Sequence, residues 1–342
     1  MAEDSTPVER KVQLTGGSTY TVSLPKEWAS SQAIEPGSTV HIYSRRDWLV
    51  LTQAQTDRDR RSATIVAGGR NPPELALHVA AAYVAGCEEI RVEGVLDTAH
   101  RRAIRDAVSG LVGIEIHEET AETIVARTML DVADLSPSQT LVQMELTTLT
   151  MHEEAIDAVL TGDSETGRRV KRQDDDVDRL FGLICREFQR SLVDVSVSQG
   201  GNGLTTFEYY AAARQLERVA DHAEKIAGVA ERIGETPPEE VTSDLNALGH
   251  QARDLVRRAL SGLLEEDDPN TLSAVVADAE RVVEEAEALD RDLYELGLTD
   301  GYLLGTVVDS IIRTAEYGVN IAESGLQVAM REPNSTFTEE KT

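Results

Sequence analysis

The chain has 342 residues, enough for about two or three domains that each bury a core of their own. Its 33 Lys and Arg against 61 Asp and Glu give a formal net charge of −28. This charge argues against nucleic-acid binding by the molecule as a whole, because DNA binding depends on cations that displace phosphate counterions. The acids are spread along the chain, which favours a solubility device for a salt-rich cell over an acidic interaction surface.

Nothing in the sequence predicts a membrane or secretory segment. No run approaches the roughly 18 apolar residues of a spanning helix, and the opening MAEDSTPVER lacks the apolar core of a signal peptide. We therefore expect a cytoplasmic protein with no membrane insertion.

Residues 8–52 are predicted to form a small β module. Apolar and polar residues alternate with a period of two in TYTVSL (19–24), TVHIYS (39–44) and WLVLT (48–52), with turns at Gly16-Gly17 and Pro36-Gly37. Residues 1–52 hold five Lys or Arg and six Asp or Glu, a net charge of −1, which leaves −27 for the remainder. This module is the part of the chain that could approach DNA at low electrostatic cost.

Residues 53–135 are predicted to form a small α/β linking domain. Between residues 62 and 119 the pattern is strand SATIVA, helix ELALHVAAAYVAG, strand EEIRVEG, helix AHRRAIRDAVSGL and strand GIEIHEE. The turn AGGRNPP matches neither a dinucleotide fingerprint nor a P-loop, so we do not expect a phosphate site there. Cys87 and Cys185 lie in apolar helical settings without a CxxC and are expected to be inert thiols.

From Ser136 onward the pattern is helical throughout. Ser136 is suited to cap a helix whose first turn contains Pro137, with Gln139 completing a capping box. Turn signals in TGDS (161–164), SQGGNG (198–203), GETPP (234–238), EDDPN (266–270) and LTDG (298–301) divide the remainder into six helices. Six helices with short connections predict a bundle or a pair of three-helix bundles.

The segment RQLERVADHAEKIA (214–227) sets Glu217 and Asp221 four residues apart on one strip of a helix. One interpretation is a charged surface strip in which Asp221 pairs with Lys225. The other is that the two carboxylates bind a hard cation, which prefers several oxygen ligands.

A second copy of this helix favours the cation interpretation. IIRTAEYGVNIAES (311–324) aligns on it, so that Glu316 falls on Asp221. An acid-bearing helix precedes each copy: QDDDVDRL (173–180), with Asp174 and Asp178, and EEAEALDRDL (284–293), with Glu287 and Asp290. The pattern is two tandem three-helix units, at 136–233 and 239–331.

These helices resemble the PhoU-type phosphate-uptake regulators, whose repeats carry an E/DxxxD motif inside segments like LERVADHAEKIA (216–227). In that family the acids bind multinuclear iron or zinc clusters on the bundle surface. The resemblance implies a metal-binding role for six residues here: Asp174, Asp178, Glu217, Asp221, Glu316 and Asp290.

The second repeat departs from that family pattern. Ile312 stands in place of Glu217 and Ala286 in place of Asp174, and the distance in sequence from Asp290 to Glu316 is 17 residues shorter than from Asp178 to Asp221. We therefore expect metal binding chiefly in the first repeat.

The N-terminal module resembles the AbrB/SpoVT/MazE swapped-hairpin family, through RKVQLTGGSTYTVSLPKEW (10–28) followed by IEPGSTVHIYSRRDWLVL (34–51). The family interlocks two chains, so the resemblance implies a homodimer or a higher oligomer. Basic side chains of its hairpin face contact DNA, which implies that role for Arg10, Lys11, Lys26, Arg45 and Arg46. The alternative is a module kept for dimerisation alone. The acidic composition also resembles that of halophilic archaeal proteins.

No pattern predicts an enzyme. His117-Glu118-Glu119 and His152-Glu153-Glu154 lack the second His of a zinc protease, and a carboxylate-bridged di-metal enzyme should show Glu-x-x-His pairs that do not recur. The leading hypothesis is a DNA-binding regulator of phosphate uptake with a metal-binding helical sensing domain. The alternative is an adaptor that acts on a phosphate transporter ATPase or a sensor kinase without binding DNA.

Overall fold

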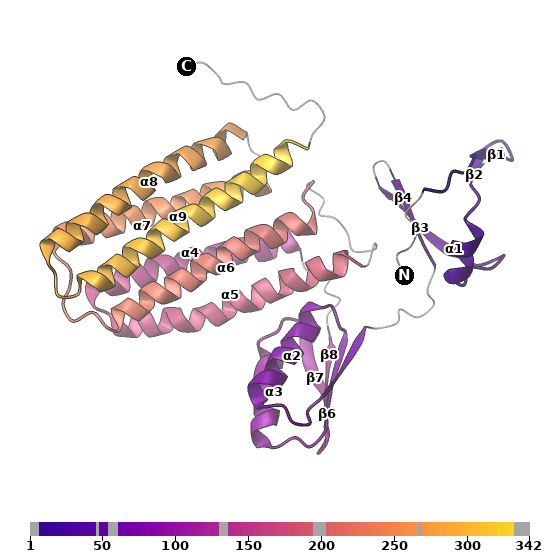
Figure 1. Ribbon diagram of the computed structural model, residues 1–342, viewed down its shortest axis with the longest axis horizontal. Coiled ribbons are helices and arrows are strands. Elements are labelled where there is room, and N and C mark those ends of the chain that lie inside the picture. Colours follow the sequence, from indigo (N-terminus) through magenta and orange to yellow (C-terminus); the bar gives the residue numbers. More distant parts are fainter. Residues whose placement is uncertain are drawn as a thin grey trace. The chain divides into compact units, whose positions relative to one another are not determined.

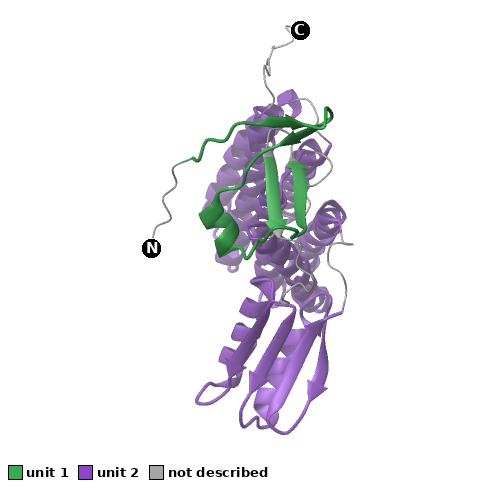
Figure 2. Cartoon of the chain, turned by 90° about the vertical axis from the view of Figure 1, so that its right-hand side faces the viewer, with its two compact units in different colours: residues 1–59 green, residues 60–342 purple. Residues whose placement is uncertain are grey.

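The computed structural model describes residues 7–45, 48–53, 61–129, 136–193, 203–265 and 269–331. The chain divides into two compact units, residues 1–59 and 60–342, which Figure 2 colours separately. The expected organisation is confirmed: N-terminal strand hairpins, an α/β part and a C-terminal helical region follow one another along the chain. In the described residues, no helix is both long enough and apolar enough to cross a membrane.

The first unit contains two antiparallel β-hairpins and one short helix. β1 (Gln13–Thr15) pairs with β2 (Thr19–Thr21), and β3 (Val40–Arg45) pairs with β4 (Trp48–Gln53), as separate two-stranded sheets. Gly16 and Gly17 turn the first hairpin at φ 63° and 81°, where a side chain would be strained. α1 (Lys26–Ser31) begins after Pro25. The strands and turns predicted for this module are confirmed.

The described residues of the first unit form no buried core. Across residues 7–44 and 49–52 every described side chain is exposed or half-buried, including large apolar ones: Tyr20 is 77% exposed, Leu49 62% and Ile42 59%. Isolated two-stranded hairpins are marginally stable in water, and packing over these apolar side chains would stabilise them.

The α/β part contains four strands and two helices within residues 61–129. In chain order these are β5 (Ser62–Val66), α2 (Pro72–Val84), β6 (Glu89–Glu93), α3 (Thr98–Ser109), β7 (Ile114–Glu119) and β8 (Thr123–Thr128). The sheet order is β5-β6-β8-β7; β5 and β6 are parallel, whereas β8 is antiparallel to both of its neighbours. β8 was not predicted, yet it connects β6 to β7.

The sheet of the α/β part carries its helices on one face (Figure 1). α2 begins with a reciprocal capping box between Asn71 and Glu74, and its Leu75, Val79 and Tyr83 enter the core. Charged side chains lie on strand positions that alternate with the core residues, where Glu89 accepts from Arg127 at 2.8 Å. These charged side chains lie on the face of the sheet opposite the helices, and they allow that face to be stable in water without helices over it.

The helical region consists of α4 (Pro137–Thr161), α5 (Ser164–Ser191), α6 (Thr206–Ala230), α7 (Glu239–Leu264), α8 (Pro269–Leu296) and α9 (Gly301–Ala329). Figure 1 shows them side by side with their long axes roughly aligned. The Ser136 side chain accepts the N–H of Gln139 as predicted, and Gly162, at φ 69°, ends α4. A single apolar core runs through both sets of three helices, and α6 packs against α9.

Arg186 on α5 joins the α/β part to the helices. Its guanidinium is fully buried and donates to the Tyr83 carbonyl at 2.5 Å, the Cys87 carbonyl at 2.9 Å and Thr128 Oγ1 at 3.3 Å. The guanidinium also lies 4.7 Å from the centre of the Tyr83 ring. The carbonyl end of α2, where the helix dipole is negative, therefore holds a buried cation that has no carboxylate partner in the described part of the chain.

Candidate functional site: a carboxylate cluster on the first repeat

Four of the predicted metal ligands lie on two helices that pack against each other. Asp174 and Asp178 belong to the middle of α5, and Glu217 and Asp221 to the middle of α6. Val170, Val177 and Ile184 recur every seven residues on α5 and turn into the core. This stripe leaves Asp174 and Asp178 at the edge of the helix pair, where they face the acids of α6.

The acids of the two helices act on the pKa of Asp174. Burial raises the pKa of Asp174 to about 7, and the negative charges of Asp178 and Asp221 add to the increase. The pKa of Asp178 is raised for the same reasons, by burial first and by Asp221 next. Ionising the carboxylates of this cluster therefore costs free energy in the folded protein.

Glu217 brings an unpartnered oxygen to this cluster. Burial and the charge of Asp221 raise the pKa of Glu217, while Arg214, whose Nη1 lies 3.2 Å from Glu217 Oε1, acts in the opposite direction. The other oxygen, Oε2, is buried and has no hydrogen-bond partner among the described residues. A buried acceptor without a donor is costly, and a cation would satisfy it.

The structure adds a fifth acid, Glu224, which the sequence argument did not single out. Its charge contributes to the raised pKa of both Asp174 and Asp178. Glu224 follows Asp221 by three residues, so the helical period could have indicated it. Lys225 does not form the ion pair predicted with Asp221; its Nζ lies 3.1 Å from Asp309 on α9.

The donor chemistry of the cluster suits a hard cation or iron, because it consists of carboxylate oxygens. The side chains are not placed to coordinate one metal ion together. Within the described ranges, no three His, Cys, Asp or Glu side chains are arranged closely enough to hold one ion. The carboxylates suit a metal ion by their chemistry and charge, but their side chains would have to move closer together to bind one.

The structure does not bring Asp290 and Glu316 together. A methyl group on Gly305 of α9 would lie 3.1 Å from Asp290 Oδ1. Glu316 is eleven residues farther along the same helix, a rise of about 16 Å, and pairs with Arg313 at 2.6 Å. The second repeat therefore has no counterpart of the carboxylate cluster at these two residues.

The predicted DNA-contacting residues lie in the first unit. Arg10, Lys11 and Lys26 are exposed, and Arg10 Nη1 donates to the carbonyl of Glu9 at 2.9 Å. Arg45 ends β3, and its side chain is not described. Arg46 lies outside the described residues.

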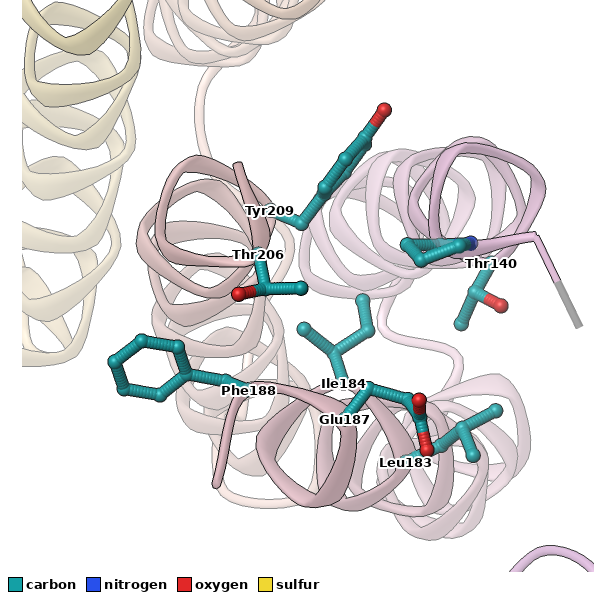
Figure 3. A pocket seen from close by; sticks show the side chains of 8 residues that line it. Thr140, Leu183, Ile184, Glu187, Phe188, Thr206 and Tyr209 are labelled. Carbon is teal, nitrogen blue, oxygen red and sulfur yellow. The ribbon is translucent and has the colours of Figure 1, made fainter. Parts of the chain in front are cut away.

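A cavity of about 290 Å³, including its open space, lies between α4, α5 and α6 (Figure 3). Its walls are mostly apolar, and Glu187, which pairs with Arg190 at 3.1 Å, is its one acid among the described residues. Glu187 follows Asp178 by nine residues, which is about 13 Å along α5. The cavity is therefore separate from the carboxylate cluster. Its lining residues are Pro137, Thr140, Leu183, Ile184, Glu187, Phe188, Thr206 and Tyr209.

Family models match two parts of the chain. The PhoU domain matches residues 141–230, the range of α4 to α6, and the model described as antidote-toxin recognition MazE, bacterial antitoxin, matches residues 13–58. No curated protein matches the chain.

Solved structures are similar over the helical region. PhoU from Pseudomonas aeruginosa is 20% identical, with a TM-score of 0.50 over 57% of this chain and 95% of that one. The phosphate transport system regulatory protein PhoU from Streptococcus pneumoniae is 17% identical, with a TM-score of 0.50 over 57% of this chain and 94% of that one. Likeness at this identity shows the fold alone. The chain thus resembles PhoU proteins in its helical region and carries a match to the MazE model near its N-terminal end.

Proposed function

We propose that the protein regulates phosphate uptake, as a dimeric transcriptional regulator that binds DNA through its first unit and a metal through its first helical repeat. The proposal is carried by the PhoU domain at residues 141–230, on which the carboxylate cluster lies. No motif for catalysis supports an enzyme, and the role proposed is regulatory.

The exposed apolar surface of the first unit supports a homodimer or a higher oligomer. A module of about 45 residues buries too little surface to be stable alone, and pairing with a second copy would cover side chains such as Tyr20, Ile42 and Leu49. Light scattering of the full chain at micromolar concentration tests this. A monomer would contradict the proposal.

The exposed cations of the first unit support DNA binding. Arg10, Lys11 and Lys26 carry no carboxylate partner among the described residues, and the segment is nearly neutral in an otherwise acidic chain. Replacing all three by Ala should weaken DNA binding and flatten the plot of log K against log salt by roughly 0.9 for each lost phosphate contact.

The alternative function is an adaptor without DNA binding that acts on a phosphate transporter ATPase or a sensor kinase. The observation that favours it is the exposed apolar surface of the first unit, which dimerisation alone would explain. Binding of the purified chain to fragments of its own genome separates the two functions. If no fragment binds at any salt concentration, the adaptor is the better description.

The carboxylate cluster supports a metal, iron or zinc, in the first repeat. Elemental analysis of the purified protein should find iron or zinc that is lost in the pair Glu217→Gln and Asp221→Asn. The matched control pair, Glu316→Gln and Asp290→Asn, lies in the second repeat and should retain it. Equal loss in both pairs would remove the assignment to the first repeat.

The role in phosphate uptake is tested in cells that lack the gene. Phosphate uptake and the transcripts of phosphate transporters should lose their dependence on external phosphate, and the full chain should restore it. Restoration by a chain without residues 1–53 would show that the function does not need the hairpins of the first unit.

A further inference from the structure

A groove lies between α7 and α8 of the second repeat. Residues at helical spacings of three, four and seven line both walls: Asp244, Ala247, Leu248 and Gln251 on α7, and Glu285, Ala288, Leu289 and Asp292 on α8. The groove encloses about 590 Å³, including space open to solvent. These spacings place the lining residues on one face of each helix, and that face is left without a neighbour along two turns.

Small residues keep the groove open, and leucines form its floor. Ala247 and Ala288 lie where a larger side chain would fill the space between the helices, and Leu248 and Leu289 beneath them are buried. Because α7 and α8 are consecutive helices that run in opposite directions, Asp244 lies at the same end of the groove as Asp292, and Gln251 at the same end as Glu285. The groove thus has an apolar floor and a polar rim.

The rim is negative and unneutralised. Asp244, Glu285 and Asp292 are exposed, and none of them forms an ion pair with a described residue. Two other acids of α8 do have partners, since Asp278 lies 2.8 Å from Arg258 and Glu287 lies 4.0 Å from Arg291. Gln251 adds an acceptor, because its Oε1 is buried without a hydrogen-bond partner in the described part of the chain.

The negative charge of the rim decides which kinds of molecule could bind in the groove. A second copy of this chain carries a net charge of −28 and would bring negative charge to a negative rim. Residues 332–342, EPNSTFTEEKT, hold three Glu and one Lys, so the end of this sequence has the wrong sign as well. A polyanion is excluded for the same reason. A cationic segment remains.

We propose that this groove binds a basic amphipathic helix of another protein. Leucines or similar residues at i, i+3, i+4 and i+7 of the incoming helix would pack on the apolar floor, as in other helix-in-groove complexes. Lys or Arg side chains flanking that stripe would reach the rim carboxylates, which on α8 are seven residues and about 10 Å apart. The inference does not depend on metal or DNA binding by the first repeat and the first unit.

A synthetic helix tests the groove directly. The probe is a fluorescent peptide with Leu at helical spacing and flanking Lys, compared with a peptide of the same composition in scrambled order. The full chain should bind the first peptide more tightly than the scrambled one, measured by fluorescence anisotropy. Equal binding of the two would mean that an acidic protein attracts any cationic peptide, and would overturn the proposal.

Matched charge variants locate the binding. The groove variant carries Asp244→Asn, Glu285→Gln and Asp292→Asn. Its control carries Glu239→Gln, Glu280→Gln and Glu287→Gln, which are exposed on the same helices outside the groove lining and remove the same number of charges. The groove variant should lose about tenfold in affinity, or about 1.4 kcal/mol, and the control less than about twofold. Equal losses would overturn the proposal.

A third variant tests the shape of the groove without changing charge. Ala247→Trp, on the exposed rim of α7, should fill the groove and weaken peptide binding even at high salt, where ion pairs are screened. Circular dichroism checks that the helices are retained. If the groove variant instead changes the mass of the protein alone in solution, the occupant is a second copy and the proposal is wrong.

Discussion

Asp174→Asn should stabilise the metal-free protein at about pH 8 by roughly 1–2 kcal/mol and should have little effect near pH 4. Burial and the surrounding acids raise the pKa of Asp174 from 3.8 to about 7 in the folded protein. Between these two values the folded state keeps a proton that the unfolded state has lost. Stability is therefore present below the unfolded pKa and is lost as the pH rises through the folded pKa.

The magnitude follows from the size of that shift. A shift of one pKa unit corresponds to about 1.36 kcal/mol, so three units set an upper limit near 4 kcal/mol. The cluster lies at the surface of the helix pair, where solvent screens part of the repulsion, which reduces the expected effect to roughly 1–2 kcal/mol. Asn resembles the protonated acid and removes the pH dependence that belongs to this group.

Urea unfolding in the presence of a chelator measures the effect at about pH 4, 6 and 8, with helix content as the signal. Asp176→Asn is the matched control, because Asp176 lies on the same turn of α5 but pairs with Arg179 at 3.8 Å and is not a cause of the raised pKa. The control should change stability by less than about 0.5 kcal/mol. Equal stabilisation of the two variants at pH 8, or none in Asp174→Asn, would falsify the reasoning.

Three further outcomes are expected. Arg186→Met should lower the free energy of unfolding by about 3 kcal/mol, and urea unfolding checks it. The change removes the Arg186 donor to the Cys87 carbonyl and leaves the Tyr83 carbonyl with the Gly86 N–H alone. Gly167→Ala should cost about 1–3 kcal/mol, since the added methyl group would lie 2.8 Å from the Ala227 carbonyl, whereas Gly182→Ala on the same helix meets nothing within 4 Å and should gain about 0.5–1 kcal/mol; thermal melting compares them. In light scattering, a chain without residues 1–53 should form an assembly of fewer copies than the full chain does, because it lacks the exposed apolar hairpins.

Local signals in the sequence were enough for most of the elements. The segments that alternate with a period of two form the hairpins of the first unit. As predicted, Ser136 caps the start of α4 and the turn at Gly162 ends it. Each of these features depends on residues within a few positions of one another. The same is true of Glu217 and Asp221, whose spacing of four places them together on any helix.

β8 was missed because its sequence has no local signature of a half-buried strand. Ile124, Val125 and Ala126 are buried in succession, so the alternation of apolar and polar residues disappears. The strand is specified by β6 and β7, its neighbours on both sides, and Ile124 pairs with Val92 more than thirty residues earlier. Such pairing is visible only in the folded sheet.

The partners of the acids were equally beyond local reasoning. Lys225 follows Asp221 by one helical turn, which predicts an ion pair, yet Asp309 on α9 attracts it instead. The contact joins the two repeats across 84 residues. Its effect on the first repeat is to leave Asp221 free to act on the pKa of Asp174 and Asp178.

The register of the second repeat explains why its acids do not form the same cluster. α5 and α8 each contain 28 residues, and Asp174 and Asp178 are the eleventh and fifteenth of α5. The same positions of α8 are Ala279 and Val283, whereas EEAEALDRDL, aligned with QDDDVDRL by its acids, lies about two turns farther along. An alignment by acidic residues therefore pairs two segments that lie at different positions along their helices.

The two repeats thus have the same helices and different surfaces. On α6 and α9 the twelfth residues are Glu217 and Ile312, so an acid of the first repeat is replaced in the second by an apolar side chain packed against the core. With Ala279 buried on the facing helix, the second repeat uses these positions for packing, which removes the charge repulsion that raises the pKa of Asp174. Three of its acids without an ion pair among the described residues, Asp244, Glu285 and Asp292, lie beside the groove of α7 and α8. Removing the rim charges should therefore leave the pH dependence of Asp174 unchanged, because the two sets of acids lie on different helix pairs and share no partner.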